Sequence, residues 1–193
     1  MRHLILAIAM LSILTACGGT STAPPAATAE PKKSERRTGI EGVDSVVDAV
    51  VSGDLEMLRR LLRFTSISCE VNPLGIGAPP GCRLGEADGT PVDALPMAQC
   101  EGFYVRADEI DTTLESLTSG DASLYAVYLE APGSWPPGDY VAVLSRNSPT
   151  LGEVGQQLVI ADGRLVGVVE SCGLTPEQMV ESGYFDGVVL PPP

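Results

Sequence analysis

The first hydrophobic pattern beyond residue 40 is that of two consecutive helices. Five valines recur at the spacing of one helix face: Val43, Val46, Val47, Val50 and Val51. Gly53 ends this helix, and Asp54 is placed to cap a second one. In the second helix four leucines face inward: Leu55, Leu58, Leu61 and Leu62. Because valine is a weak helix former, we expect packing against the rest of the domain to hold the first helix.

Farther along the chain the pattern changes to short apolar runs typical of strands. Residues 64–69 and 100–105 are β-like, and residues 108–117 are predicted to form a helix between them and the next runs. Four further strands are predicted: 124–129, 140–144, 157–161 and 165–171. Both alternations of these runs are apolar. One sheet face should therefore pack on helices, and the other should be covered or line a cavity.

Glycine and proline mark the remaining segments. Asp162-Gly163 predicts a tight hairpin, because both turn positions tolerate positive φ. Residues 72–96 contain so many Gly and Pro that we expect no regular structure there. A loop of that length is usually functional or stapled, and Cys82 favours stapling without deciding between the two. The segment Thr175-Pro176-Glu177-Gln178 is a capping box that opens a short helix.

The predicted order of elements resembles a known family. Residues 51–58 (VSGDLEML) enter the second helix through Gly-Asp-Leu, and residues 162–165 (DGRL) form a late hairpin. Together with the order of helices and strands, they resemble the SnoaL-like branch of the nuclear-transport-factor-two superfamily over residues 41–171. The resemblance implies an α+β fold in which a curved antiparallel sheet wraps around helices as a cone with a cavity, here stapled by two disulfides. The Asp/His pairs of catalytic members have no counterpart in this chain.

The first residues have the layout of an export signal. Arg2 is followed by the apolar run 4–14, which is too short to span a membrane as a helix. Leu14-Thr15-Ala16-Cys17 resembles the lipobox of bacterial lipoproteins, which implies a signal peptide over 1–16 and a lipid on Cys17. A plain secretory signal is the alternative.

The rest of the chain divides into three parts. Residues 17–39 are poor in large apolar side chains and predict a flexible tether. Basic side chains gather near its end: Lys32, Lys33, Arg36 and Arg37. They favour either attraction to anionic lipid or a solvated linker. Residues 40–190 form one domain, and residues 191–193 are predicted to be a disordered tail.

Charge and histidine content exclude several functions. Residues 40–193 contain seven arginines, no lysine and twenty-three acidic residues, a net charge of −16. This field repels phosphates, so we expect no nucleic-acid partner. The one histidine, His3, lies in the signal segment. The mature chain therefore lacks the imidazole of Ser-His-Asp or Cys-His catalysis and of most transition-metal sites.

Four cysteines follow Cys17, an even number that predicts two disulfides in an exported protein. Three connectivities are open. We favour Cys69–Cys82, which would staple the Gly/Pro loop, and Cys100–Cys172, which would tie an early strand to the end of a late one. Zinc held by four thiolates is the rival, but the chain has no Cys-x-x-Cys pair.

Three places carry candidate chemistry. Trp135, the only tryptophan, lies on a Pro-rich loop and either recognises a ligand or folds back over the edge of the core. Glu86, Asp88 and Asp93 offer oxygens to a calcium-like ion, although their spacing matches no EF-hand. Asp139 is a candidate general base beside Tyr140. No catalytic residue and no metal site is assigned.

We therefore predict a lipid-anchored, acidic binding or interaction domain outside the cytoplasm, in the cell envelope. It uses no cofactor, and its partner is a small hydrophobic ligand or an envelope protein. A surface of Trp135 and the 70–99 loop would serve the latter. The alternative is a carboxylate-dependent isomerase or hydrolase that acts on a small hydrophobic molecule in the domain's cavity.

Overall fold

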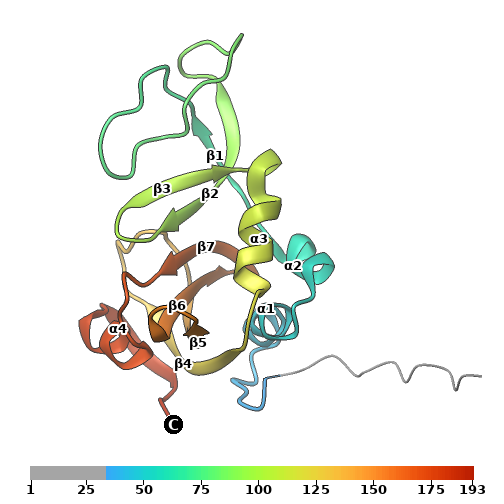
Figure 1. Cartoon of the computed structure of the whole chain (residues 1–193), viewed down its shortest axis with the longest axis vertical. Coiled ribbons are helices and arrows are strands. Elements are labelled where there is room, and N and C mark those ends of the chain that lie inside the picture. Colours follow the sequence, from blue (N-terminus) through green and yellow to red (C-terminus); the bar gives the residue numbers. More distant parts are fainter. Residues whose placement is uncertain (1–33) are drawn as a thin grey trace, which may run out of the picture. The chain divides into compact units, whose positions relative to one another are not determined.

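The fold is built on one eight-stranded sheet in a computed structural model (Figure 1). The structure describes residues 34–193. The predicted signal peptide 1–16, Cys17 and the predicted tether as far as residue 33 lie outside the described residues.

The helices begin and end where local signals predict. Helices α1 (Glu41–Ser52) and α2 (Leu55–Leu61) carry the valine and leucine faces, and Asp54 caps α2 by accepting a hydrogen bond from Met57 N at 2.9 Å. A short 3-10 turn, η1 (Ala107–Glu109), leads into α3 (Ile110–Thr118). Helix α4 (Pro176–Ser182) opens with the predicted capping box. None of the helices in residues 34–193 has the length and apolar character needed to cross a bilayer.

Most neighbouring strands of the sheet are also consecutive in the chain. In chain order they are β1 (Thr65–Ser68), β2 (Pro91–Ala98), β3 (Gly102–Arg106), β4 (Ala122–Glu130), β5 (Tyr140–Ser148), β6 (Gly152–Ala161), β7 (Arg164–Glu170) and β8 (Phe185–Leu190). The sheet order is β1-β2-β7-β6-β5-β4-β8, and β3 pairs with β2, so the exceptions are β2 with β7 and β4 with β8. Strands β4 to β7 form an antiparallel meander, and Asp162 has the positive φ (49°) of the predicted hairpin. The α+β class is confirmed.

Two strands contradict the sequence prediction. The prediction that residues 72–96 lack regular structure is wrong, because β2 begins at Pro91 and includes Pro96. Strand β7 pairs with β2 only at Met97 and Ala98, and this pair is parallel. Pro91 is the first residue of β2, opposite Ser68 of β1, and Pro96 lies opposite Tyr104 of β3 before the pairing with β7 begins. The first residue of a strand and a stretch that is unpaired on one side both tolerate a missing N–H. Strand β8 was not predicted at all, and it pairs with β4.

The space between the sheet and helices α1, α2 and α3 is filled with large side chains. The largest fully buried ones come from both layers: Leu58, Leu95, Leu114, Leu117, Leu144, Leu158, Ile160 and Leu165. A smaller cluster lies on other positions of β4 and β5, where Tyr128 stacks on Phe185 at 4.4 Å between ring centroids. These two clusters agree with the expectation that one sheet face packs on helices and the other is covered.

The beginning and end of the described chain meet. Arg36 donates to the carbonyl oxygens of Tyr125 and Pro191, and Arg37 pairs with Asp48 at 2.8 Å. Ser34 N also donates to Asp48 at 3.1 Å. Residues 34–39, the last six of the predicted tether, thus contact the domain.

Candidate functional site

The first part of the site is a loop closed by a disulfide. Cys69 and Cys82 are bonded, with their Cα atoms 5.0 Å apart, and Cys69 is fully buried. Beside the bridge, Glu70 N donates to Pro80 O at 3.0 Å and Cys82 N donates to Glu70 O at 2.9 Å. The segment 70–90, called the stapled loop below, is therefore fixed at its base by one covalent bond and two hydrogen bonds.

The second disulfide fixes the neighbouring hairpin. Cys100 lies in the turn between β2 and β3, and Cys172 follows β7, with 5.3 Å between the two Cα atoms. The bridge spans 72 residues. Both favoured pairings are present, so the sulfurs are not available as zinc ligands.

Ion pairs hold the stapled loop against β3 and η1. Arg106 lies 2.6 Å from Glu86, and Arg83 pairs with Asp108 and Glu109. The hydrogen bond from Arg106, followed by one from the backbone N–H of Arg83, lowers the pKa of Glu86 to about 2. Glu86 is therefore ionised at neutral pH and attached to the domain.

The three candidate calcium ligands have separate roles. Glu86 is held by Arg106, Asp88 accepts a hydrogen bond from Val71 N at 2.9 Å, and Asp93 lies on β2 opposite Ser66. Among residues 34–193, the group whose ligand atoms lie close enough for a metal is Cys69, Cys82 and Glu86, and both of its sulfurs are in the disulfide. The structure does not bring the three carboxylates together as one ligand set.

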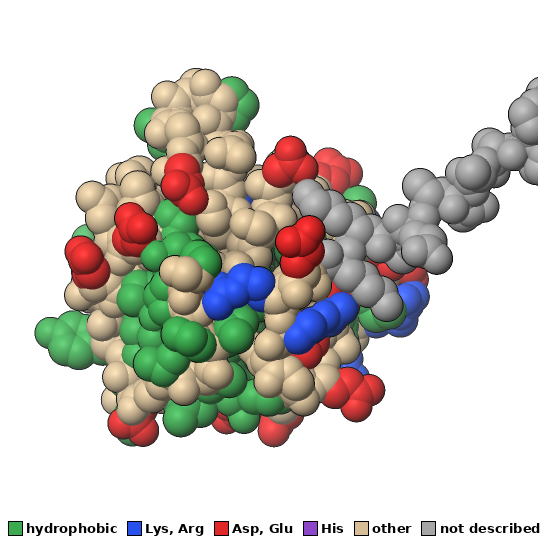
Figure 2. Space-filling model, turned by 90° about the horizontal axis from the view of Figure 1, so that it is seen from below, with side chains coloured by type: hydrophobic (Ala, Val, Ile, Leu, Met, Phe, Trp, Pro, Cys, Tyr) green, Lys and Arg blue, Asp and Glu red, His purple; other side chains and the backbone are tan. Residues whose placement is uncertain are grey.

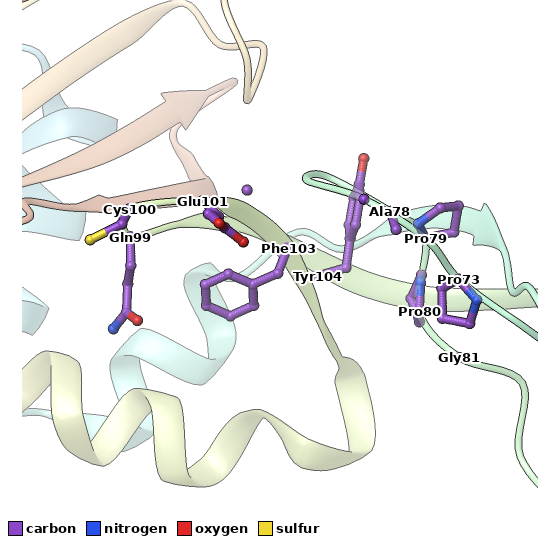
Figure 3. Close-up of a pocket in the computed structure, with 12 residues that line it drawn as sticks. Pro73, Ala78, Pro79, Pro80, Gly81, Gln99, Cys100, Glu101, Phe103 and Tyr104 are labelled. Carbon is purple, nitrogen blue, oxygen red and sulfur yellow. The ribbon is translucent and has the colours of Figure 1, made fainter.

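A groove runs between the stapled loop and the β2–β3 hairpin. Its volume is about 560 Å³. Figure 3 shows Phe103 and Tyr104 pointing to opposite sides of β3, with Pro73, Pro79 and Pro80 on the facing loop. We call this feature the Tyr104 groove. The prolines and the Tyr104 ring are rigid and lose little conformational entropy on binding, and Gln99 and Glu101 add polar groups to the lining.

Trp135 extends the aromatic surface beside this groove. Its ring meets Tyr104 edge to face at 5.8 Å, and a Cβ on Gly102 would lie 2.9 Å from the indole. Only glycine therefore lets Trp135 approach β3 so closely. The next residue, Pro136, packs on Gly167 of β7. Trp135 remains 42% exposed. It has folded back, but onto β3 beside the groove, and it still presents area to solvent.

The loop that forms one side of the groove carries apolar side chains that nothing in the described structure covers. Four of them project from the stapled loop, with exposed fractions of 57% for Val71, 86% for Leu74, 73% for Ile76 and 107% for Leu84. Large apolar side chains concentrated on one exposed loop of a folded domain favour an interaction role for that loop. Trp135 adds a fifth apolar side chain at the same end of the domain.

The groove lies in acidic surroundings. Residues 70–104 contain five carboxylates and one arginine. In the described part of the chain most arginines already pair with carboxylates: Arg37, Arg59, Arg60, Arg63, Arg83 and Arg106. Figure 2, which views the domain from the end opposite the stapled loop, shows acidic side chains around a hydrophobic area there too, so the acidic surplus is not confined to the groove. The surplus charge favours a cationic partner.

The candidate general base has a structural role. Asp139 accepts a hydrogen bond from Asp162 N at 2.9 Å and so links the start of β5 to the β6–β7 turn. Among the described carboxylates, burial raises the pKa of Glu130, but Glu130 is not among the residues that line the groove. No described carboxylate is thus both desolvated and placed in the Tyr104 groove.

Tyr104 and Arg106 are the site residues that the sequence did not reveal. A Gly-x-Tyr-x-Arg alternation along 102–106 puts three residues on one face of β3, and this alternation is the available signal. The alternation alone does not identify a site, because Tyr104 and Arg106 contact Trp135 and Glu86, which come from distant segments.

Comparison of this chain with protein-family models, with curated proteins and with solved structures found no match.

Proposed function

We propose that this protein is a lipid-anchored domain outside the cytoplasm whose Tyr104 groove binds a protein partner. The partner presents an extended segment with apolar side chains flanked by lysine or arginine. The observation that carries the proposal is the set of exposed apolar side chains on the stapled loop, which forms one side of the groove and is held in place by a disulfide and ion pairs. An ordered apolar surface of this kind costs solubility, and binding offsets that cost.

The location rests on Cys17 and on the disulfides. The lipobox at Leu14–Cys17 predicts the anchor, and two disulfides are typical of an oxidising compartment. In Figure 1 the described chain starts beside α1, at the opposite end of the domain from the stapled loop. The point at which the described chain begins is therefore separate from the groove.

The family assignment is part of the same proposal. Helices α1, α2 and α3 share one core with the meander β4 to β7, which is the layering expected of a SnoaL-like cone. In this chain the space inside that layering is occupied by leucine, isoleucine and valine side chains. We therefore favour surface binding over the alternative, an isomerase or hydrolase acting on a hydrophobic molecule inside the domain.

Trp135 allows a direct test, because it is the only tryptophan and lies beside the groove. The full chain, purified from membranes in a nonionic detergent, is titrated with two short peptides of equal length. One alternates leucine with lysine, and the other alternates leucine with glutamate. We expect a saturable blue shift of Trp135 emission with the lysine peptide, weakened by salt, and none with the glutamate peptide.

Matched variants locate the binding. Leu84→Gln and Ile76→Gln remove exposed apolar side chains of the stapled loop, and each should weaken binding about tenfold. Val188→Gln, on β8, removes an exposed apolar side chain that does not line the groove and should leave binding unchanged. Equal affinity for both peptides, or equal losses in all three variants, would overturn the proposal.

A further inference from the structure

A second pocket contains a row of polar side chains that continues the core side of the sheet. Arg146 follows core residue Leu144 on β5 by two positions, and Gln156 precedes Leu158 on β6 by two. Glu170 follows Val168 on β7 by two and is paired with Gln156. Because side chains alternate along a strand, all three face the helices. They line a pocket of about 520 Å³ that the end of α3 also borders.

Hydrogen bonds hold this row in place. Arg146 Nη1 donates to Gln156 Oε1 at 3.1 Å, and Arg146 Nη2 donates to the carbonyl oxygens of Ser116 and Ser119. Glu170 Oε2 accepts a hydrogen bond from Gln99 Nε2 at 2.5 Å. Gln156 is only 3% exposed. The charged groups are therefore positioned before any ligand arrives.

Arg146, like Arg36 and Arg164, is a described arginine whose hydrogen bonds go to neutral acceptors. Within residues 34–193 its guanidinium has no carboxylate in ion-pair distance, and its acceptors are an amide and two backbone carbonyls. Burial lowers the pKa of the guanidinium, while the nearby Glu170 charge opposes that shift. Its Nε–H takes part in none of these bonds. Ser171 is among the residues that line the same pocket, and its Oγ is buried with no hydrogen-bond partner in the described structure.

We propose that this pocket, the Arg146 pocket, binds a small zwitterion of the α-amino-acid type. The ligand carboxylate lies against Arg146 and Ser171, and its ammonium group lies against Glu170. A bare anion fits less well, because Glu170 lines the same pocket and repels it. Leu151 and Val154 border the pocket and accept an apolar side chain. The pocket shares no lining residue with the Tyr104 groove, and the two proposals are tested with different probes.

The test is a calorimetric titration of the purified full chain with three probes. They are L-leucine, N-acetyl-L-leucine, which lacks the ammonium charge, and L-leucinamide, which lacks the carboxylate. We expect L-leucine to bind and each blocked form to bind at least about tenfold more weakly. L-valyl-L-leucine and L-leucyl-L-valine then show whether the source is a free amino acid or a peptide end, since a peptide separates the two charges.

Variants tie the binding to the named residues. Glu170→Gln keeps an acceptor for Gln99 but removes the charge, so it should abolish the preference for L-leucine over N-acetyl-L-leucine. Arg146→Lys keeps a positive charge but lacks the planar pair of donors, so it should weaken the binding of L-leucine about tenfold. Glu153→Gln, an acidic residue of β6 that is not part of the pocket lining, is the matched control and should bind normally.

Each result of these titrations either supports or overturns the proposal of an amino-acid site. Selective binding of L-leucine that Glu170→Gln converts to non-selective binding supports the proposal. No heat with any probe at millimolar concentration overturns it, as does equal affinity for N-acetyl-L-leucine, which would identify a simple anion site. Thermal unfolding of Arg146→Lys is measured in parallel. If Arg146→Lys is unfolded, the proposal is tested with Glu170→Gln alone. That variant should stay folded, because glutamine can still accept the hydrogen bond from Gln99.

Discussion

Arg106 and Glu86 form a two-point ion pair, with Nη2 2.6 Å from Oε1 and Nη1 3.0 Å from Oε2. The side chain of Arg106 is only 11% exposed, which places this pair among the better shielded ones of the domain. It joins the stapled loop to β3, and thereby to the Tyr104 groove. A bidentate arginine–carboxylate pair fixes geometry as well as charge.

The pair predicts that the stapled loop is sensitive to acid. Hydrogen bonds from Arg106 and from the backbone of Arg83 lower the pKa of Glu86 to about 2 from its ordinary 4.5. Because the folded pKa lies below the unfolded one, the stabilisation is complete above pH 4.5 and is lost as the pH falls to 2. In Glu86→Gln this component of the acid-induced loss should disappear, as measured by urea unfolding at several pH values.

The control for this experiment is Glu56→Gln. Glu56 pairs with Arg60 one helical turn away, and its side chain is 72% exposed. Exposed pairs of this kind contribute little to stability. The pH dependence of that variant should match the wild type, and the same flattening in both variants would argue against a special role for Glu86.

The two disulfides should contribute unequally to stability. The Cys69–Cys82 bridge closes 13 residues and the Cys100–Cys172 bridge closes 72. Chain entropy then predicts losses of about 3 kcal/mol for Cys69→Ala with Cys82→Ala and about 4.5 kcal/mol for Cys100→Ala with Cys172→Ala. Urea unfolding under oxidising conditions measures both. Alkylation of any of these four cysteines in the folded, unreduced wild type would contradict the bridges.

Local signals account for the parts of the fold that the sequence predicts well. The valine face of α1, the Asp54 cap and the positive-φ turn at Asp162 each depend on residues within one or two turns of one another. Strand β2 lacks such a signal. Its prolines indicate a loop, and only pairing with β1, β3 and β7 makes the segment a strand.

The candidate sites depend on contacts between distant segments. The Tyr104 groove combines residues 73–81 with 99–104, and Trp135 reaches it from a separate loop. The Arg146 pocket depends on the register of β5, β6 and β7. Runs that are apolar on both alternations do not specify which face a following polar residue takes. The sequence therefore predicts Trp135 as a candidate but gives no indication of Arg146.

Gly167→Ala should displace the Trp135 loop. A Cβ at this position of β7 would lie 2.5 Å from Pro136 Cγ and 2.6 Å from Pro136 Cβ, so the loop must shift. Overpacking of this kind costs about 1–3 kcal/mol. The movement should separate Trp135 from Tyr104 and shift tryptophan emission to longer wavelength.

Gly81→Ala serves as the matched control, since an added methyl there meets only Pro73, at an ordinary 3.8 Å. Its emission spectrum and stability should remain close to the wild type. An unchanged spectrum in Gly167→Ala would show that Pro136 does not position Trp135.

Cys17→Ala decides whether the domain is anchored by lipid. If the Leu14–Cys17 lipobox is used, the full chain incorporates an alkyne-labelled fatty acid and the mature protein lacks residues 1–16. The variant has no thiol to acylate at this position, so labelling should disappear and the domain should leave the membrane fraction. Cys100→Ala with Cys172→Ala removes two other sulfurs and should keep the label. Because a single short chain binds membranes only marginally, wild-type membrane retention after a salt wash further requires more than one acyl chain. The opposite result is a wild-type chain that is cleaved, carries no label and is free in the extracytoplasmic fluid. It would show that residues 1–16 act as a plain secretory signal and that Cys17 carries no lipid. The Tyr104 groove would then be tested on the unanchored domain.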